Sequence, residues 1–414
     1  MVAAPSTIET LRERYQRIRE TSLRLIADLQ PEDTVVQSMP DVSPTKWHLA
    51  HVTWFFERFV LEACGVQRFN DEYHYLFNSY YNSVGTMHPR PKRGEITRPT
   101  LSEVLDYRAH FDETMTAVLD AGRFEGELTD VLELGLQNEQ QHQELLLTDI
   151  KHVLAQNPLR PAARLDLEVP PRVAAPALDF VDGDTGLVRI GHEGCGFCYD
   201  NETPRHDALL HPHRIANRLV TNGEYRQFIR EGGYEQPEHW LSDGWAAIRD
   251  RGWNRPLYWD EALETEFTLG GTREIDDDAP VTHVSYYEAD AFARWAGARL
   301  PTEFEWEHVA QRETVVGNLM AGHYWQPAAS ATSRQLFGDV WEWTSSAYAP
   351  YPGFKPLPGS LGEYNGKFMC NQMTVRGGSC VTANDHIRAT YRSFFYPDAR
   401  WQFLGFRLAK DGHG

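Results

Sequence analysis

Residues 135–152, "GLQNEQQHQELLLTDIKH", have the pattern of a long helix that carries metal-binding side chains. Asn138 and His142 lie one helical turn apart, so their side chains share a face. Glu139 is also within reach of that face. A site of two histidines and Glu139 would suit non-haem iron(II), whereas the amide oxygen of Asn138 is a weaker ligand and water a further alternative. The stretch departs from the HExxH pattern of zinc proteases at its first position, which argues against that class.

A second source of imidazoles is the segment "WHLAHVTWFFERF", residues 47–59, which contains His48 and His51. Their spacing puts both side chains on one side of an apolar, aromatic helix. A histidine on such a face is more often a hydrogen-bonded core residue than a metal ligand. Residue spacing alone therefore leaves open whether either of them meets His142.

The N-terminal part of the chain shows helical periodicity in four segments. The first opens with Thr7 as an N-cap and places Leu11, Tyr15, Ile18 and Leu23 on one stripe. Helices of this length predict a four-helix bundle, in which metal sites are built from side chains that project inward. The four segments are residues 7–30, 43–65, 100–122 and the segment around His142, which ends before residue 156. Residues 71–99, between the second and third, are rich in Tyr, Asn, Gly, Pro and Arg and predict a long functional loop.

The second half of the chain differs from the first in composition and in the length of its apolar segments. Residues 157–176 are rich in Pro, Ala and Arg and predict a linker. Short apolar runs broken by Gly, Pro, Asn and Asp follow, with many Trp and Tyr, which are typical of an irregular α+β domain. The sequence therefore predicts two domains, residues 1–156 and residues 177–414. Cys195 and Cys198 form a lone CxxC, which indicates loop packing more than zinc binding or redox work.

The charge balance limits the classes of partner. A formal net charge of -19 and a pI near 5.3 argue against broad binding to nucleic acid or anionic membranes and leave room for small-molecule substrates. The first residues lack the basic and apolar regions of a signal peptide, and no segment is apolar for as long as a bilayer requires. We therefore expect a cytoplasmic protein.

Several strings together resemble one known family. "HLAHVTWFFE" and "NEQQHQELLLTDIKH" in the first half, with "RLPTEFEWE", "GDVWEW", "RGGS" and "GFR" in the second, are similar to the ergothioneine-biosynthesis sulfoxide synthases, EgtB. The resemblance covers nearly the whole chain. It implies a DinB-like four-helix bundle followed by a domain with the formylglycine-generating-enzyme, C-type-lectin-like fold. It also implies an O2-dependent, non-haem iron(II) enzyme that joins the sulfur of cysteine or γ-glutamylcysteine to imidazole C2 of hercynine and oxidises that sulfur to a sulfoxide.

The resemblance also implies a metal-ligand set. Family members hold iron with three histidines, one on the second helix and two on the fourth. The first corresponds to His51 and the last to His142. The middle one falls on Asn138, so this chain lacks one expected imidazole.

Further positions correspond to substrate and proton-transfer residues of the family. Tyr80 and Tyr81 match a tyrosine pair beside the iron and are candidates for proton donation, with packing in an aromatic loop as the alternative. Arg90 matches an arginine that grips the carboxylate of the sulfur donor, while Arg93 is a weaker candidate and more typical of a solvated charge. The remaining substrate-binding candidates are Gln141, Ser393, Phe394 and Phe395, and Ser393 replaces an expected asparagine.

The two departures, at Asn138 and Ser393, leave alternatives open. One is a SenA-like selenoneine synthase, in which a selenosugar donates selenium to the same carbon of hercynine. Another is a metal-poor pseudoenzyme that binds hercynine-like cations without redox chemistry. A third is that Asn138 is an introduced change in an otherwise active enzyme.

Overall fold

The computed structural model of the chain describes residues 9–122, 126–331 and 334–412. The chain divides into two compact units, Met1–Val153 and Leu154–Gly414. Residues 157–176, predicted as a linker, form no helix or strand, although the backbone N–H of Ala163 donates to the carbonyl of Leu269 at 2.8 Å. Each unit is described separately below.

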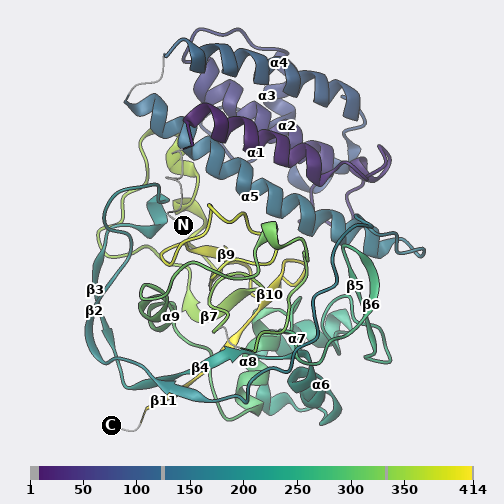
Figure 1. Cartoon of the computed structure of the whole chain (residues 1–414), viewed down its shortest axis with the longest axis vertical. Helices are drawn as coiled ribbons and strands as arrows, with labels where there is room; N and C mark the ends of the chain where they lie inside the picture. Colours follow the sequence, from purple (N-terminus) through teal and green to yellow (C-terminus); the bar gives the residue numbers. More distant parts are fainter. Residues whose placement is uncertain (1–8, 123–125, 332–333, 413–414) are drawn as a thin grey trace, which may run out of the picture. The chain divides into compact units, whose positions relative to one another are not determined.

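Four long helices that run side by side make up most of the N-terminal unit (Figure 1). They are α1 (Leu11–Leu25), α2 (Thr45–Phe56), α4 (Leu101–Asp120) and α5 (Glu127–Gln156). The predicted helical bundle is therefore confirmed. The prediction of one long loop over residues 71–99 is wrong in part, because this stretch contains helix α3 (Asp71–Phe77) and the 3-10 segment η3 (Arg90–Glu95). The remaining short elements are η1 (Asp33–Val35) and the π-helical turn η2 (Glu57–Leu61).

Local capping chemistry sets where α1 begins. The hydroxyl of Thr10 accepts the backbone N–H of Glu13 at 3.2 Å, and the Glu13 carboxylate accepts the backbone N–H of Thr10 at 2.8 Å. This reciprocal capping box satisfies two backbone donors that a helix start leaves unpaired. The helix therefore starts after Thr10 rather than at the predicted Thr7, which lies outside the described residues.

The polar part of the bundle core centres on Glu139 of α5. Its carboxylate accepts hydrogen bonds from Arg19 Nη1 at 3.0 Å, from Ser22 Oγ at 2.6 Å and from Arg108 Nη2. Burial raises the pKa of Glu139, but the guanidinium groups of Arg108 and Arg19 outweigh burial and lower the pKa to about 2. The apolar stripe predicted for α1 is therefore wrong at Leu23, which is 38% exposed, because buried Arg19 and Ser22 turn inward to meet this carboxylate.

The C-terminal unit is an irregular mixture of short helices and small sheets, as predicted (Figure 1). Its sheets have the strand orders β1-β4-β11, β10-β7-β8-β9, β2-β3 and β5-β6. The strands of the first two sheets are β1 (Phe180–Asp182), β4 (His213–Leu219), β11 (Arg407–Asp411), β10 (Leu404–Gly405), β7 (Trp341–Ala347), β8 (Met373–Arg376) and β9 (Ser393–Phe395). The other strands are β2 (Gly186–Ile190), β3 (His206–Leu210), β5 (Thr265–Thr268) and β6 (Gly271–Glu274), and the α-helices are α6 (Asn222–Arg230), α7 (Ser242–Arg251), α8 (Tyr286–Trp295) and α9 (Glu303–Ala310).

The motif strings of the second half form the core of this unit. The side chains of Trp306 and Trp343 are fully buried, so these two tryptophans of the Trp-rich strings serve as core packing. Gly377, in the string "RGGS", has φ +96° and lies where an added Cβ would be 2.5 Å from the carbonyl oxygen of Leu336. Only glycine fits such a turn and such a close approach.

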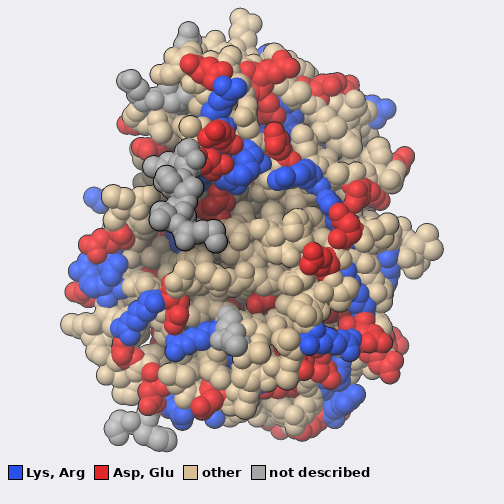
Figure 2. Space-filling view, in the orientation of Figure 1, with Lys and Arg blue, Asp and Glu red and all other residues tan. Residues whose placement is uncertain are grey.

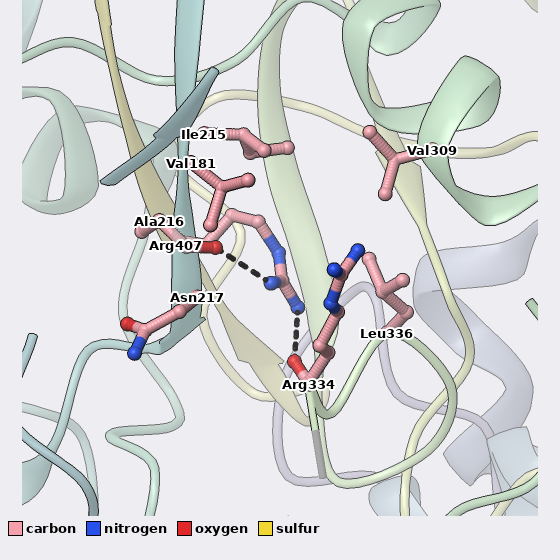
Figure 3. Close-up of a pocket in the computed structure, with 8 residues that line it drawn as sticks. All are labelled: Val181, Ile215, Ala216, Asn217, Val309, Arg334, Leu336 and Arg407. Atoms are coloured by element: carbon pink, nitrogen blue, oxygen red, sulfur yellow. Dashed lines mark hydrogen bonds between the residues drawn. The ribbon is translucent and has the colours of Figure 1, made fainter. Parts of the chain in front are cut away.

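A shallow hollow of the C-terminal unit is lined mainly by apolar side chains and by two arginines (Figure 3). Arg407 donates there to the carbonyl oxygens of Ala216 at 3.3 Å and Arg334 at 3.1 Å, and its guanidinium also pairs with buried Glu342. None of the residues predicted to bind metal or substrate lines this hollow. We therefore interpret it as packing around a structural ion pair.

Acidic and basic side chains are interspersed on the face of the molecule shown in Figure 2. Within the described part of the chain, every helix is too short or too polar to cross a bilayer.

Candidate functional site

His51 lies in α2, a helix in which every residue is buried. Its Nδ1 is 2.7 Å from the carbonyl oxygen of Phe77, so the Nδ1 proton is donated to that oxygen. Its Nε2 is buried and makes no hydrogen bond to any described residue. Burial lowers the pKa of His51 to about 3, so the ring is neutral at physiological pH and Nε2 keeps its lone pair. This is the state in which a histidine binds a metal.

Two indole rings hold the plane of the His51 ring. Trp47, one turn earlier on α2, stacks on the imidazole with ring centroids 4.7 Å apart and planes 8° apart. Trp54, one turn later, lies 5.6 Å away at 23°. The aromatic residues of α2 therefore do more than fill the core, because they also fix the orientation of His51 as a ligand requires.

His142 of α5 lies beside His51, with the two ring centroids 4.6 Å apart. Burial lowers the pKa of His142 well below its ordinary value, and the neighbouring His51 lowers it further. Two neutral imidazoles from facing helices therefore come together in the bundle. The structure thus brings together the two predicted histidines, and their ligation of a metal stays a prediction.

His48, which spacing alone left open as an alternative to His51, is hydrogen-bonded to His142. The Nδ1 atoms of His48 and His142 are 2.9 Å apart, and His48 Nε2 is 3.0 Å from Asp149 Oδ2. The only sequence signal for Asp149 is its position two helical turns after His142, which puts both residues on one face of α5.

Asn138 lies one turn before His142 on α5 and is 1% exposed. Glu139 is held by Arg19 and Arg108, so the interpretation of Glu139 as a third metal donor is wrong. No three His, Cys, Asp or Glu side chains in the described ranges form a group that could hold a metal ion. The potential donors here are therefore two imidazoles and the amide of Asn138.

The predicted tyrosine pair follows α3. The Tyr81 side chain is fully buried and its ring centroid is 5.9 Å from that of Trp54, whereas Tyr80 is half-buried. Their hydroxyl oxygens are 3.5 Å apart. Since Phe77 supplies the carbonyl that accepts the His51 proton, the segment that carries both tyrosines is tied directly to the histidine site.

Arg93 is buried, so the prediction of a solvated charge is wrong. Its side chain is 4% exposed, and its guanidinium carbon is 3.3 Å from the centroid of the Trp47 ring. Nη1 donates to Ser43 Oγ at 2.8 Å, while Nε is buried without a hydrogen bond and no described carboxylate forms an ion pair with this guanidinium. Burial lowers the pKa of Arg93 well below its ordinary value, neighbouring Arg90 lowers it further, and the Asp149 carboxylate opposes these effects only in part. A buried cation without a paired anion is costly, which indicates a place kept for an anionic ligand.

Arg93 also lines a small hollow of the N-terminal unit. The other residues that line it are Lys46, Trp47, Phe77, Ile96, Pro99 and Val104. Arg90, the arginine favoured by the sequence, is exposed and donates through Nη2 to the carbonyl of Asp41 at 2.6 Å. Between the two, the buried guanidinium of Arg93 is the stronger candidate for a substrate carboxylate.

The other predicted substrate residues are divided between the two units. Gln141 is half-buried on α5, next to His142 in the sequence. In the C-terminal unit, Ser393, Phe394 and Phe395 form β9 and are half-buried. Phe394 stacks on Tyr348 with ring centroids 4.0 Å apart. Their contact with substrate stays a prediction.

All five cysteines are free thiols. Burial and, to a smaller extent, the neighbouring Glu202 raise the pKa of the Cys198 thiol to about 11. A thiol with a raised pKa is a poor nucleophile and a poor metal ligand, in keeping with loop packing for this CxxC pair.

Two protein families match the chain, one in its N-terminal unit and one in its C-terminal unit. Residues 14–146 match the DinB superfamily, and residues 168–333 and 330–412 match the sulfatase-modifying factor enzyme 1-like domain. The predicted fold class, a DinB-like bundle followed by a formylglycine-generating-enzyme-like α+β domain, is therefore confirmed.

The chain is 31% identical to the hercynine oxygenase of Mycolicibacterium thermoresistibile, in an alignment that covers 99% of this chain and 96% of that protein. The chain belongs to the hercynine oxygenase family. The hercynine oxygenase of Mycolicibacterium smegmatis is also 31% identical, over 97% of this chain and 99% of that protein. The formylglycine-generating enzyme of Streptomyces coelicolor is 28% identical over 58% of this chain and 89% of that enzyme. Membership of the hercynine oxygenase family confirms the predicted EgtB resemblance and an oxidoreductase function.

Proposed function

We propose that this hercynine oxygenase relative is an iron(II)- and O2-dependent enzyme that joins the sulfur of cysteine or γ-glutamylcysteine to imidazole C2 of hercynine. The observation that carries the proposal is the buried pair of neutral imidazoles, His51 and His142. As the C–S bond forms, C2 and the thiol each lose one hydrogen. One atom of O2 is transferred to the sulfur, giving a sulfoxide, and the other leaves as water with those two hydrogens, so that four electrons balance.

The residues present fit an iron site that lacks one protein ligand. His51 offers a buried Nε2 without a hydrogen-bond partner among the described residues, His142 lies beside it, and Asn138 offers a weaker amide oxygen. When bound, iron(II) supplies one-electron chemistry with O2 and holds the donor thiolate. Because only two protein donors are strong, substrate or water must complete more of the coordination than in a site with three histidines.

Two arginines of the bundle interact with the carboxylate of the sulfur donor, and two tyrosines take part in proton transfer. Arg93 binds the donor's carboxylate, because its guanidinium is buried beside Trp47 and no carboxylate of the described residues is within ion-pair distance of it. Arg90, at the exposed end of the same segment, is a second cation that attracts this group. Tyr80 supplies a proton, since its half-buried hydroxyl lies 3.5 Å from that of Tyr81, which can replace the proton.

Contacts with hercynine are carried over from the family resemblance. They comprise Gln141 in the bundle and Ser393, Phe394 and Phe395 in the C-terminal unit. The faces of aromatic rings attract a quaternary ammonium group, which suits the trimethylated nitrogen of hercynine.

Asn138 and Ser393 also motivate a second candidate function, selenoneine synthesis from hercynine and a selenosugar. Both residues depart from the family pattern at positions expected to touch metal or substrate. Asn138 alone motivates a third candidate, a pseudoenzyme that binds hercynine without holding iron.

Separate reactions with each donor distinguish these functions. The purified 414-residue chain, loaded anaerobically with iron(II), is mixed with hercynine and with cysteine, γ-glutamylcysteine or a selenosugar, and O2 is then admitted. We expect a product whose mass equals hercynine plus the thiol plus two oxygen atoms minus water. Turnover with the selenosugar alone would replace the proposed function by selenoneine synthesis, and hercynine binding without O2 consumption would leave the pseudoenzyme.

A further inference from the structure

His48 is a buried histidine to which the proposed function assigns no role. It lies on α2, three residues before His51, and is 3% exposed. Each of its ring nitrogens contacts one group: Nδ1 is 2.9 Å from His142 Nδ1, and Nε2 is 3.0 Å from Asp149 Oδ2. Asp149, His48 and His142 therefore form a hydrogen-bonded chain that ends on a proposed metal ligand.

The carboxylate end fixes the direction of the hydrogen bonds in this chain. Asp149 Oδ2 also accepts the backbone N–H of Ser43 at 2.8 Å, so this oxygen acts as an acceptor, and His48 Nε2 donates its proton to it. A neutral imidazole has only one N–H, which leaves His48 Nδ1 with a lone pair. Across the 2.9 Å contact, His142 Nδ1 must then be the donor.

We infer that Asp149 and His48 fix the tautomer of His142, with the proton on Nδ1 and the lone pair on Nε2, where iron binds. The identity of the metal rests on the proposed function, whereas the tautomer is a property of the metal-free protein. His48 and Asp149 are positioning residues in this role, because they act through His142. The opposite tautomer would carry the proton on Nε2 and block the atom that ligates.

Two further observations support this assignment. His48 is 3% exposed, and such burial favours the neutral ring that the direction of the chain requires. His51 reaches the same state by a different route, because its Nδ1 proton is donated to the Phe77 carbonyl at 2.7 Å. Both proposed ligands therefore have the Nδ1 proton tied to an acceptor, and loss of such an outer partner typically weakens metal binding by about 10- to 100-fold.

The matched variants His48→Leu and His48→Asn test the inference. Leucine removes the acceptor for the His142 proton, whereas the Asn side-chain oxygen can occupy the place of Nδ1. The tautomer of His142 is read by 15N NMR of the metal-free chain labelled at histidine, with His142→Gln used to assign the signals. Iron(II) affinity is measured by anaerobic titration, and circular dichroism confirms that each variant is folded.

We expect the wild-type chain and His48→Asn to carry the His142 proton on Nδ1. His48→Leu should give a mixture of tautomers and about 10- to 100-fold weaker iron(II) binding. A wild-type His142 protonated on Nε2 would overturn the inference, even if no variant folds. Unchanged tautomer and affinity in folded His48→Leu would overturn it as well. If no iron binds to any form but the tautomer changes in His48→Leu, the inference stands and the proposed function fails.

Discussion

Replacing Asn138 with histidine is expected to tighten iron(II) binding by about 100-fold or more. Loss of an outer hydrogen-bond partner of a ligand histidine already lowers metal affinity by about 10- to 100-fold, and a ligand itself contributes more. Asn138 is buried one turn before His142 on α5, so the new imidazole would lie on the same helix face as that ligand. A third neutral nitrogen donor would replace an amide oxygen, which is a weak ligand for iron(II). Anaerobic titration against a chromogenic chelator measures the change.

The control for Asn138→His is Gln137→His, which adds an imidazole to the same buried stretch of α5. One residue corresponds to a rotation of about 100° around the helix, so this imidazole would point away from His142. We expect wild-type iron affinity for Gln137→His. Equal affinity of the two variants, or no gain from Asn138→His, would contradict the placement of the iron site beside residue 138.

Replacing Arg93 with methionine is expected to have opposite effects on activity and on stability. The value of kcat/KM for the thiol donor should fall by about 30- to several thousand-fold, because removal of one partner of a buried charge pair costs roughly 2–5 kcal/mol. The free energy of unfolding of the substrate-free protein should rise by about 1–2 kcal/mol, because a buried cation without a paired anion is replaced by an apolar side chain of similar length. Donor-dependent kinetics and urea unfolding measure the two effects.

Arg90→Met is the matched control for Arg93→Met. Arg90 is exposed, and an exposed charge contributes about 1 kcal/mol or less, so we expect kcat/KM to fall by less than about tenfold and stability to stay unchanged. A loss of stability in Arg93→Met together with unchanged donor kinetics would show that Arg93 serves the fold instead of the substrate.

The helical bundle and the histidine pair could be predicted because both depend on short-range patterns. A period of 3.6 residues marks the long helices, and family-specific strings identify His51 and His142 within them. The structure adds how these residues meet. Ring stacking on Trp47 and a hydrogen bond to the Phe77 carbonyl orient His51, and the second contact depends on where the short helix α3 ends, which the periodicity of the long helices does not predict.

Buried charges could not be predicted, because their burial is decided by partners far away in the sequence. Arg19 lies on the inward face of α1, where its guanidinium donates to Glu139, 120 residues later, and to Asp112, 93 residues later. Arg93 lies in a segment rich in Pro, Gly and charged residues, a composition typical of a solvent-exposed loop, yet its guanidinium packs on Trp47. Sequence reasoning therefore assigned Arg93 to the surface and allowed Glu139 as a metal ligand, and the structure reverses both interpretations.

Anaerobic iron(II) titration of the wild-type chain, of His51→Ala and of His142→Ala tests most directly whether the two buried imidazoles form the metal site. Both histidines are neutral and lie with ring centroids 4.6 Å apart, so each should contribute a ligand to one ion. We predict one iron(II) per wild-type chain. Binding should be at least about 100-fold weaker in either variant, since removing a ligand lowers metal affinity more than removing an outer hydrogen-bond partner of a ligand does. Stoichiometric iron binding that persists unchanged in both variants would contradict this assignment.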